Sequence, residues 1–255
     1  MIPIPSSKQC LLCELLHNTA LNETVCRLEF RWAGSIPRAG QFFMIRPERT
    51  SVFLGRPISA AGWNSGASSP SVHFLIAKRG RGTEELTRIN PGERAELIGP
   101  LGNAWGDLLP NEGPIALVGG GAGVAPMTAF AGELGDRAYD FYGGFKSASF
   151  GLESVHPLSL IIAGEDGSAG RRGRISDFLE PAKYRAVYAC GPEPMLKAVA
   201  GSCNKAGVPC FVSLERRMAC GVGACLGCTI KTVWGSRRCC ADGPIFNAAE
   251  VIFDE

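Results

Sequence analysis

Five cysteines lie close together near the end of the chain, and the spacing of four of them suits a metal centre. Cys220, Cys225, Cys228 and Cys240 give the pattern C-x4-C-x2-C-x11-C. Its first three members match the spacing of a plant-type [2Fe–2S] site. Two irons bridged by two sulfides need four converging thiolates, so the pattern predicts such a cluster. Cys239, next to Cys240, is an alternative fourth ligand.

The surroundings of these cysteines bear on the kind of metal. Gly221, Gly223 and Gly227 are expected to allow positive φ angles and a close backbone approach to sulfur. Zinc is the alternative, but structural zinc usually uses two short C-x2-4-C elements, and this stretch has one C-x2-C. A further C-x2-C, formed by Cys10 and Cys13, lies in an apolar run, and we interpret both as buried strand cysteines.

Two glycine-rich turns upstream suit a dinucleotide. Residues 119–126 read GGGAGVAP, after a predicted strand and before a predicted helix. Glycines there let phosphates approach a helix N-terminus, although a plain tight turn is the alternative. Residues 190–195 read CGPEPM and leave Cys190 at the carboxyl edge of a strand, where open α/β sheets bind ligands. A buried cysteine at a turn is the alternative there.

Two further segments suit a flavin nucleotide. In GRPISA (55–60), Arg56 can neutralise a phosphate and Ser59 can hydrogen-bond a flavin ring, or Arg56 is an exposed turn residue. In GRGTEEL (80–86), we expect Thr83 to be the N-cap of a short helix whose free N–H groups can hold a pyrophosphate.

The patterns around these motifs predict three domains. Residues 1–102 are β-rich, and VCRLEFRW (25–32) alternates apolar and polar residues, which favours a small barrel. Residues 113–212 contain apolar strands that lead into glycine turns and helices, which favours a Rossmann-like parallel α/β sheet. A helix should end near Gly207, a suitable C-cap. Residues 213–255 form a small cluster domain.

Composition limits the function classes. The chain has 255 residues, 45% of them hydrophobic and 20% charged, with a net charge of +2. This balance speaks against a nucleic-acid or membrane-surface binder. There is no apolar run near ~18 residues and no signal-peptide pattern at the N-terminus. We therefore expect a cytoplasmic protein, and the odd number of cysteines, eleven, argues against a disulfide framework.

The motifs together resemble a known family. RPIS, GRGT, GPLGN, GGGAGVAPM and CGPEPM occur in an order similar to that of the ferredoxin–NADP reductase superfamily with an added iron–sulfur domain. ERRMACGVGACLGC followed by CCADGPIF resembles the electron-transfer subunits of NAD-linked, two-subunit dihydroorotate dehydrogenases. The resemblance covers nearly the whole chain. It implies Cys240 as the fourth ligand, because this family places that cysteine two residues before DGP.

The resemblance also implies which residues hold the other cofactors. The residues expected to bind FAD are Arg56, Pro57, Ile58, Ser59, Leu75, Ile76, Ala77, Gly82 and Thr83. The residues expected to bind NAD are Gly120, Gly121, Gly123, Gly191 and Pro192, with Cys190 as the catalytic residue beside the nicotinamide.

The implied function is electron transfer in pyrimidine biosynthesis. Electrons would pass between NAD(H), FAD, the [2Fe–2S] cluster and an FMN-containing dihydroorotate dehydrogenase catalytic subunit, as an oxidoreductase heterotetramer. A nicotinamide exchanges electron pairs and the cluster single electrons, and a flavin converts between them. We expect NAD rather than NADP, because Glu165 or Asp166 can accept from a ribose 2′-hydroxyl. Arg171 and Arg172 are interpreted as a solvated loop.

Two other functions remain open at this point. One is a flavin/iron–sulfur reductase subunit of the sulfite reductase, hydrogenase or ferredoxin–NADP transhydrogenase type, although several of these carry a C-G-x-C spacing that this chain lacks. The other is a zinc-stabilised binding module on an oxidoreductase scaffold.

Overall fold

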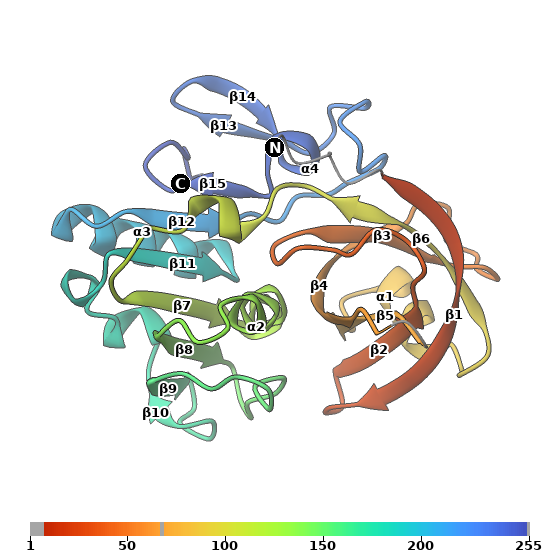
Figure 1. Ribbon diagram of the computed structural model, residues 1–255, viewed down its shortest axis with the longest axis horizontal. Helices are drawn as coiled ribbons and strands as arrows, with labels where there is room; N and C mark the ends of the chain where they lie inside the picture. Colours follow the sequence, from red (N-terminus) through yellow and green to blue (C-terminus); the bar gives the residue numbers. More distant parts are fainter. Residues whose placement is uncertain (1–7, 67–68, 254–255) are drawn as a thin grey trace.

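The computed structural model describes residues 8–66 and 69–253, and it begins with a closed six-stranded barrel (Figure 1). The strand order around the barrel is β1-β2-β5-β4-β3-β6. Its strands are β1 (Gln9–Ala20), β2 (Val25–Arg31), β3 (Phe42–Pro47), β4 (Arg56–Asn64), β5 (Ser71–Ala77) and β6 (Arg94–Leu101). Helix α1 (Arg81–Arg88) lies in the connection between β5 and β6. The predicted barrel is thus confirmed.

The barrel interior follows from the alternation seen in β2. Cys26, Leu28 and Phe30 are buried and Arg27 is exposed, as expected for a half-buried strand. Aromatic rings fill the interior, with Phe43 and Phe74 in an edge-to-face contact at 5.4 Å between ring centroids. The prediction for the cysteines of β1 is half wrong, because Cys13 is buried but Cys10 is exposed. Cys10 lies on the outward face of the strand.

A seven-stranded sheet follows, in the order β10-β9-β8-β7-β11-β12-β15. Its strands are β7 (Ile115–Gly120), β8 (Tyr139–Phe145), β9 (Ser159–Gly164), β10 (Arg171–Arg172), β11 (Ala186–Cys190), β12 (Cys210–Ser213) and β15 (Ile245–Asn247). All pair in parallel except β15. Its helices are α2 (Val124–Glu133) and α3 (Glu193–Ala206), and short 3-10 turns lie at Trp105–Leu108, Ile175–Phe178 and Pro181–Lys183. The predicted parallel sheet is confirmed, and Gly207 ends α3 with a φ of 65°.

The cysteine-rich segment forms a small module on the sheet and the barrel (Figure 1). It contains the hairpin β13 (Thr229–Thr232) and β14 (Gly235–Arg238) and the short helix α4 (Cys239–Asp242). The chain then returns to the sheet, where β15 pairs antiparallel with β12. The Asn103 side chain fixes this return, since it donates to the Ile245 carbonyl at 2.8 Å and accepts from the Ile245 N–H at 3.0 Å.

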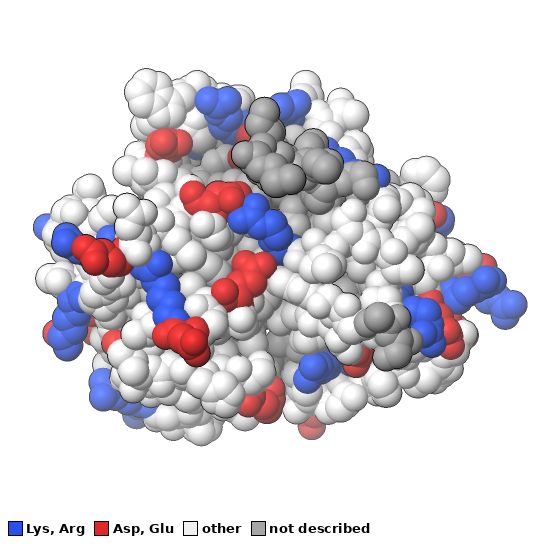
Figure 2. All heavy atoms as spheres, in the orientation of Figure 1, with Lys and Arg blue, Asp and Glu red and all other residues white. Residues whose placement is uncertain are grey.

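The carboxyl ends of the parallel strands face the barrel. Val124 and Phe145, just after β7 and at the end of β8, share an apolar cluster with Ala61 and Leu75 of the barrel. The strand ends that carry the glycine turns therefore meet β4 and β5, which carry the predicted flavin motifs. Acidic and basic side chains are interspersed over the face seen in Figure 2. Among the described residues, no helix is both long and apolar enough to cross a membrane.

Candidate functional site

The four predicted cluster cysteines lie in the module as two contacting pairs, and three of their sulfur atoms accept backbone N–H groups. Gly223 N–H donates to Cys240 Sγ at 3.1 Å, and Cys240 N–H donates to Cys228 Sγ at 3.4 Å. Val222 N–H donates to Cys220 Sγ at 3.4 Å. Burial opposes ionisation of Cys220, but backbone N–H groups outweigh it and lower its pKa to about 6. Such N–H groups suit thiolate ligands.

The thiols lie as two pairs. Cys220 is in hydrogen-bond contact with the Cys225 side chain, and Cys240 with the Cys228 side chain. A binuclear cluster needs two protein thiolates on each iron. Two pairs of thiols can supply that donor set.

The structure separates the neighbours Cys239 and Cys240. Both are buried, but Cys239 Sγ donates to the Leu214 carbonyl at 2.9 Å, toward the end of β12. Cys240 Sγ instead contacts Cys228 and the Gly223 N–H. This arrangement supports Cys240 as the fourth ligand. Burial raises the pKa of both thiols to about 12, so it is their contacts and not their pKa values that distinguish them.

The prediction for the glycines of this loop is partly wrong. Gly221 and Gly223 have φ angles of 68° and 85°, but Gly227 is not among the residues with positive φ. Leu226 takes that conformation instead, with a φ of 57°. At Gly221 a Cβ would lie 2.6 Å from the Met44 side chain of β3. The cluster loop is thus pressed against the barrel, and only glycine fits there.

The predicted flavin residues lie on neighbouring strands. Arg56, Pro57, Ile58 and Ser59 begin β4 and are all half-buried. On β5, Leu75 and Ile76 are buried and Ala77 is half-buried. The two strands pair with a bulge between Ala60 and Gly62. Because the Ile76 side chain belongs to the barrel core, it can offer only its backbone to a ligand.

Arg56 meets the N-terminus of α1. A Cβ at Gly82 would lie 2.1 Å from Arg56 Nε, so the guanidinium occupies the space left by the missing side chain. The prediction that Thr83 is the N-cap is wrong. The helix begins at Arg81, two residues before Thr83, and Gly80 is the N-cap. Thr83 Oγ1 instead accepts the N–H groups of Arg79 at 2.9 Å and Gly80 at 3.2 Å. A cation beside a helix N-terminus suits a pyrophosphate.

The two predicted dinucleotide turns pack against each other. A Cβ at Gly120 would lie 2.6 Å from Met195 Sδ, and one at Gly123 would lie 2.2 Å from the Cys190 carbonyl oxygen. A Cβ at Gly191 would lie 2.9 Å from Gly120 Cα, and Pro192 is the N-cap residue of α3. Gly121, with a φ of 53°, has open space around it. These glycines are therefore needed for packing, and Gly121 leaves room for a phosphate.

Cys190 ends β11, beside Ser213 at the end of β12. Its side chain is 2% exposed, and burial, with a smaller contribution from Glu215, raises its pKa well above the ordinary range. It is therefore a neutral thiol at the carboxyl edge of the sheet. Its assignment as the catalytic residue stays a prediction.

Sequence reasoning missed an ion pair beside this turn. Arg216 donates to Glu193 at 3.1 Å, and both side chains are half-buried. Glu193 opens α3 after the CGP turn, and Arg216 lies on the segment that leads to Cys220. The charged residues in CGPEP and SLERR are the only sequence signal for this pair, because their contact depends on the fold.

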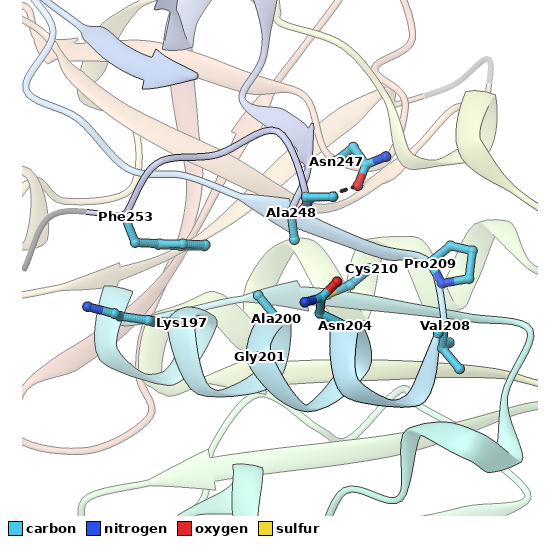
Figure 3. Close-up of a pocket in the computed structure, with 12 residues that line it drawn as sticks. Lys197, Ala200, Gly201, Asn204, Val208, Pro209, Cys210, Asn247, Ala248 and Phe253 are labelled. Atoms are coloured by element: carbon cyan, nitrogen blue, oxygen red, sulfur yellow. Dashed lines mark hydrogen bonds between the residues drawn. The ribbon is translucent and has the colours of Figure 1, made fainter. Parts of the chain in front are cut away.

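A cavity of about 570 Å³ lies elsewhere, between α3 and the chain after β15. Lys197, Asn204, Cys210 and Phe253 line it (Figure 3). It is separate from the glycine turns, and none of the predicted cofactor residues lines it.

The barrel, the parallel sheet and the thiol-bearing module define a flavin- and nicotinamide-type reductase fold with an iron–sulfur domain. Residues 215–252 match the family described as the iron–sulfur cluster binding domain of dihydroorotate dehydrogenase B. The chain is 40% identical over 220 residues to the dihydroorotate dehydrogenase B (NAD(+)) electron transfer subunit of Clostridium acetobutylicum, covering 86% of this chain and 87% of that one. It is 42% identical over 221 residues to the Clostridium perfringens protein of the same name, covering 84% and 87%. The chain belongs to this family of electron transfer subunits.

A solved structure agrees over nearly the whole chain. It is described as an NADH-dependent reduced ferredoxin-NADP oxidoreductase that performs flavin-based electron bifurcation. The TM-score is 0.80 at 25% identity, and the match covers 96% of this chain and 91% of that one.

Proposed function

We propose that this chain passes electrons between NAD(H), FAD and a [2Fe–2S] cluster, and exchanges them with an FMN-containing dihydroorotate dehydrogenase catalytic subunit. The observation that carries the proposal is the arrangement of Cys220, Cys225, Cys228 and Cys240 in two contacting pairs, three of whose sulfur atoms accept backbone N–H groups. Bound together, FAD and the cluster convert the electron pair of a hydride into single electrons.

The chain's own residues have distinct tasks in this proposal. Arg56, Gly82 and the first N–H groups of α1 hold the FAD pyrophosphate, and Ser59 hydrogen-bonds the flavin ring. The turns at Gly121 and Gly191 take the phosphates of NAD at the carboxyl edge of the sheet. The buried Cys190 thiol closes that edge as a neutral, apolar wall. We also propose the domain boundaries 1–102, 113–212 and 213–255, with β15 reaching back to the sheet.

The choice of NAD depends on the end of β9. Asp166 accepts the Ser168 N–H at 2.9 Å and the Ser168 hydroxyl at 2.7 Å. Since Asp166 is engaged in its own turn, Glu165 is left for a ribose 2′-hydroxyl. The prediction of a solvated loop at Arg171 and Arg172 is half right, because both are exposed but pair as β10 with the end of β9. Arg171 also lies over the Phe178 ring, at 5.3 Å.

Reconstitution with a catalytic partner tests the function. The chain and its FMN-containing partner, mixed and given dihydroorotate and NAD, should form NADH, followed by its absorbance. Cys225→Ser should keep NADH-to-dye activity and lose transfer to the partner. Absence of NADH formation by the wild-type pair would refute the proposal. The likeness to the ferredoxin-NADP oxidoreductase favours one alternative, which predicts reduction of ferredoxin by the chain instead.

A further inference from the structure

The loop between β3 and β4 exposes a large aromatic side chain, Phe53. Phe53 is 89% exposed, and its neighbour Leu54 is 40% exposed. Single exposed apolar residues are common, but an almost bare phenylalanine beside a predicted cofactor site calls for a specific explanation. The loop, residues 48–55, leads directly into Arg56 and the flavin motif.

Side-chain bonds hold this loop against α1. Ser51 Oγ donates to the Glu85 carboxylate at 2.6 Å, and Thr50 also donates to Glu85. Arg81 bonds to Ser51 as well. Glu85 and Arg81 both belong to α1. These three bonds tie Thr50 and Ser51 to the helix, and Phe53 follows Ser51 by two residues.

Phe53 is also close to the proposed pyrophosphate site. Arg56 Nη1 donates to the Leu54 carbonyl at 3.0 Å, and its guanidinium lies on Gly82. Three residues of chain span at most about 11 Å, so Phe53 lies within that distance of Arg56, Cα to Cα. Ser59, which we assign to the flavin ring, follows Arg56 by the same number of residues in the opposite chain direction.

This order of residues matches the order of groups in a dinucleotide. FAD has a central pyrophosphate, an isoalloxazine on one side and an adenine on the other. With the pyrophosphate held by Arg56 and the isoalloxazine toward Ser59, the adenine of a bound FAD would lie on the side of Arg56 that carries Phe53. We propose that Phe53 stacks on the adenine of FAD and thereby makes the site selective for FAD over FMN. This inference rests on the proposed function, specifically on FAD binding at β4 and α1.

The experiment compares FAD and FMN binding to the full chain. Stacking of a base on an aromatic side chain contributes about 1–3 kcal/mol, which corresponds to about 5- to 140-fold in affinity. Phe53→Ala should lower the affinity for FAD by that factor. It should change the affinity for FMN by less than about twofold, because FMN has no adenine. Phe53→Trp should retain FAD affinity. The matched control is Leu158→Ala, which removes another exposed apolar side chain, 79% exposed, on the α/β domain.

Each outcome decides a different question. Unchanged FAD affinity in Phe53→Ala, or an equal loss for FAD and FMN, overturns the adenine contact while leaving the proposed function intact. Loss of partner co-purification with unchanged FAD affinity assigns Phe53 to the protein interface instead and also overturns it. A wild-type chain that binds neither flavin refutes the proposed function, and the inference with it.

Discussion

Replacing Gly82 with alanine should separate FAD binding from folding stability. The new Cβ would lie 2.1 Å from Arg56 Nε and 2.5 Å from Arg56 Cζ. An ordinary contact needs about 3.5 Å, so the guanidinium must withdraw by more than about 1 Å. The end of an arginine side chain can move without disturbing the backbone, and Gly82 has no positive φ that alanine would strain. The fold should therefore remain intact.

The substitution should lower FAD affinity without lowering the free energy of unfolding. A hydrogen bond of about 2.9 Å does not survive a shift of this size. A bond to a charged group contributes about 1.5–3 kcal/mol, so FAD affinity should fall by about 10- to 140-fold. Helical alanine is more favourable than glycine by up to about 1 kcal/mol. The free energy of unfolding of the flavin-free chain should therefore stay equal or rise.

Two measurements check this, namely FAD titration by flavin fluorescence and denaturant unfolding of the flavin-free chain. Gly201→Ala is the matched control, since Gly201 lies within α3 and a Cβ there meets nothing within 4 Å. The control should gain similar stability and bind FAD like the wild type. If Gly82→Ala binds FAD with unchanged affinity, Arg56 does not hold the pyrophosphate and the reasoning fails.

Two further predictions concern the cysteines and pH. Cys240→Ser should lower iron and acid-labile sulfide in anaerobically purified protein, whereas Cys239→Ser should keep both, because its hydroxyl can still donate to Leu214; the reverse result would make Cys239 the ligand. Burial, with a smaller effect of Arg27, lowers the pKa of His73 in the folded chain to about 4. In the unfolded chain this pKa is about 6.5, so between pH 6.5 and 4 the unfolded chain binds a proton that the folded chain does not. The free energy of unfolding should therefore fall by up to about 3 kcal/mol between pH 6.5 and 4. In urea unfolding, His73→Gln should flatten this dependence of the free energy on pH. An unchanged dependence would show that other groups cause it.

The sequence alone determined those features that depend on neighbours along the chain. The alternation of β2, the glycine turn after β7 and the C-cap at Gly207 were predictable because strand period, turn conformation and helix ending are local properties. The spacing of Cys220, Cys225 and Cys228 likewise indicates an iron–sulfur site by itself, since a short loop must wrap the cluster.

Tertiary structure decided which residues from distant segments meet. Three contacts join segments that are distant in sequence. They are Cys239 with Leu214, Arg56 with Gly82, and Glu193 with Arg216. Local patterns also gave the wrong role to Thr83. Helix α1 starts at Arg81, and the Thr83 hydroxyl accepts the N–H groups of Arg79 and Gly80. Such contacts depend on how barrel, sheet and module pack together, and a one-dimensional pattern carries no record of that packing.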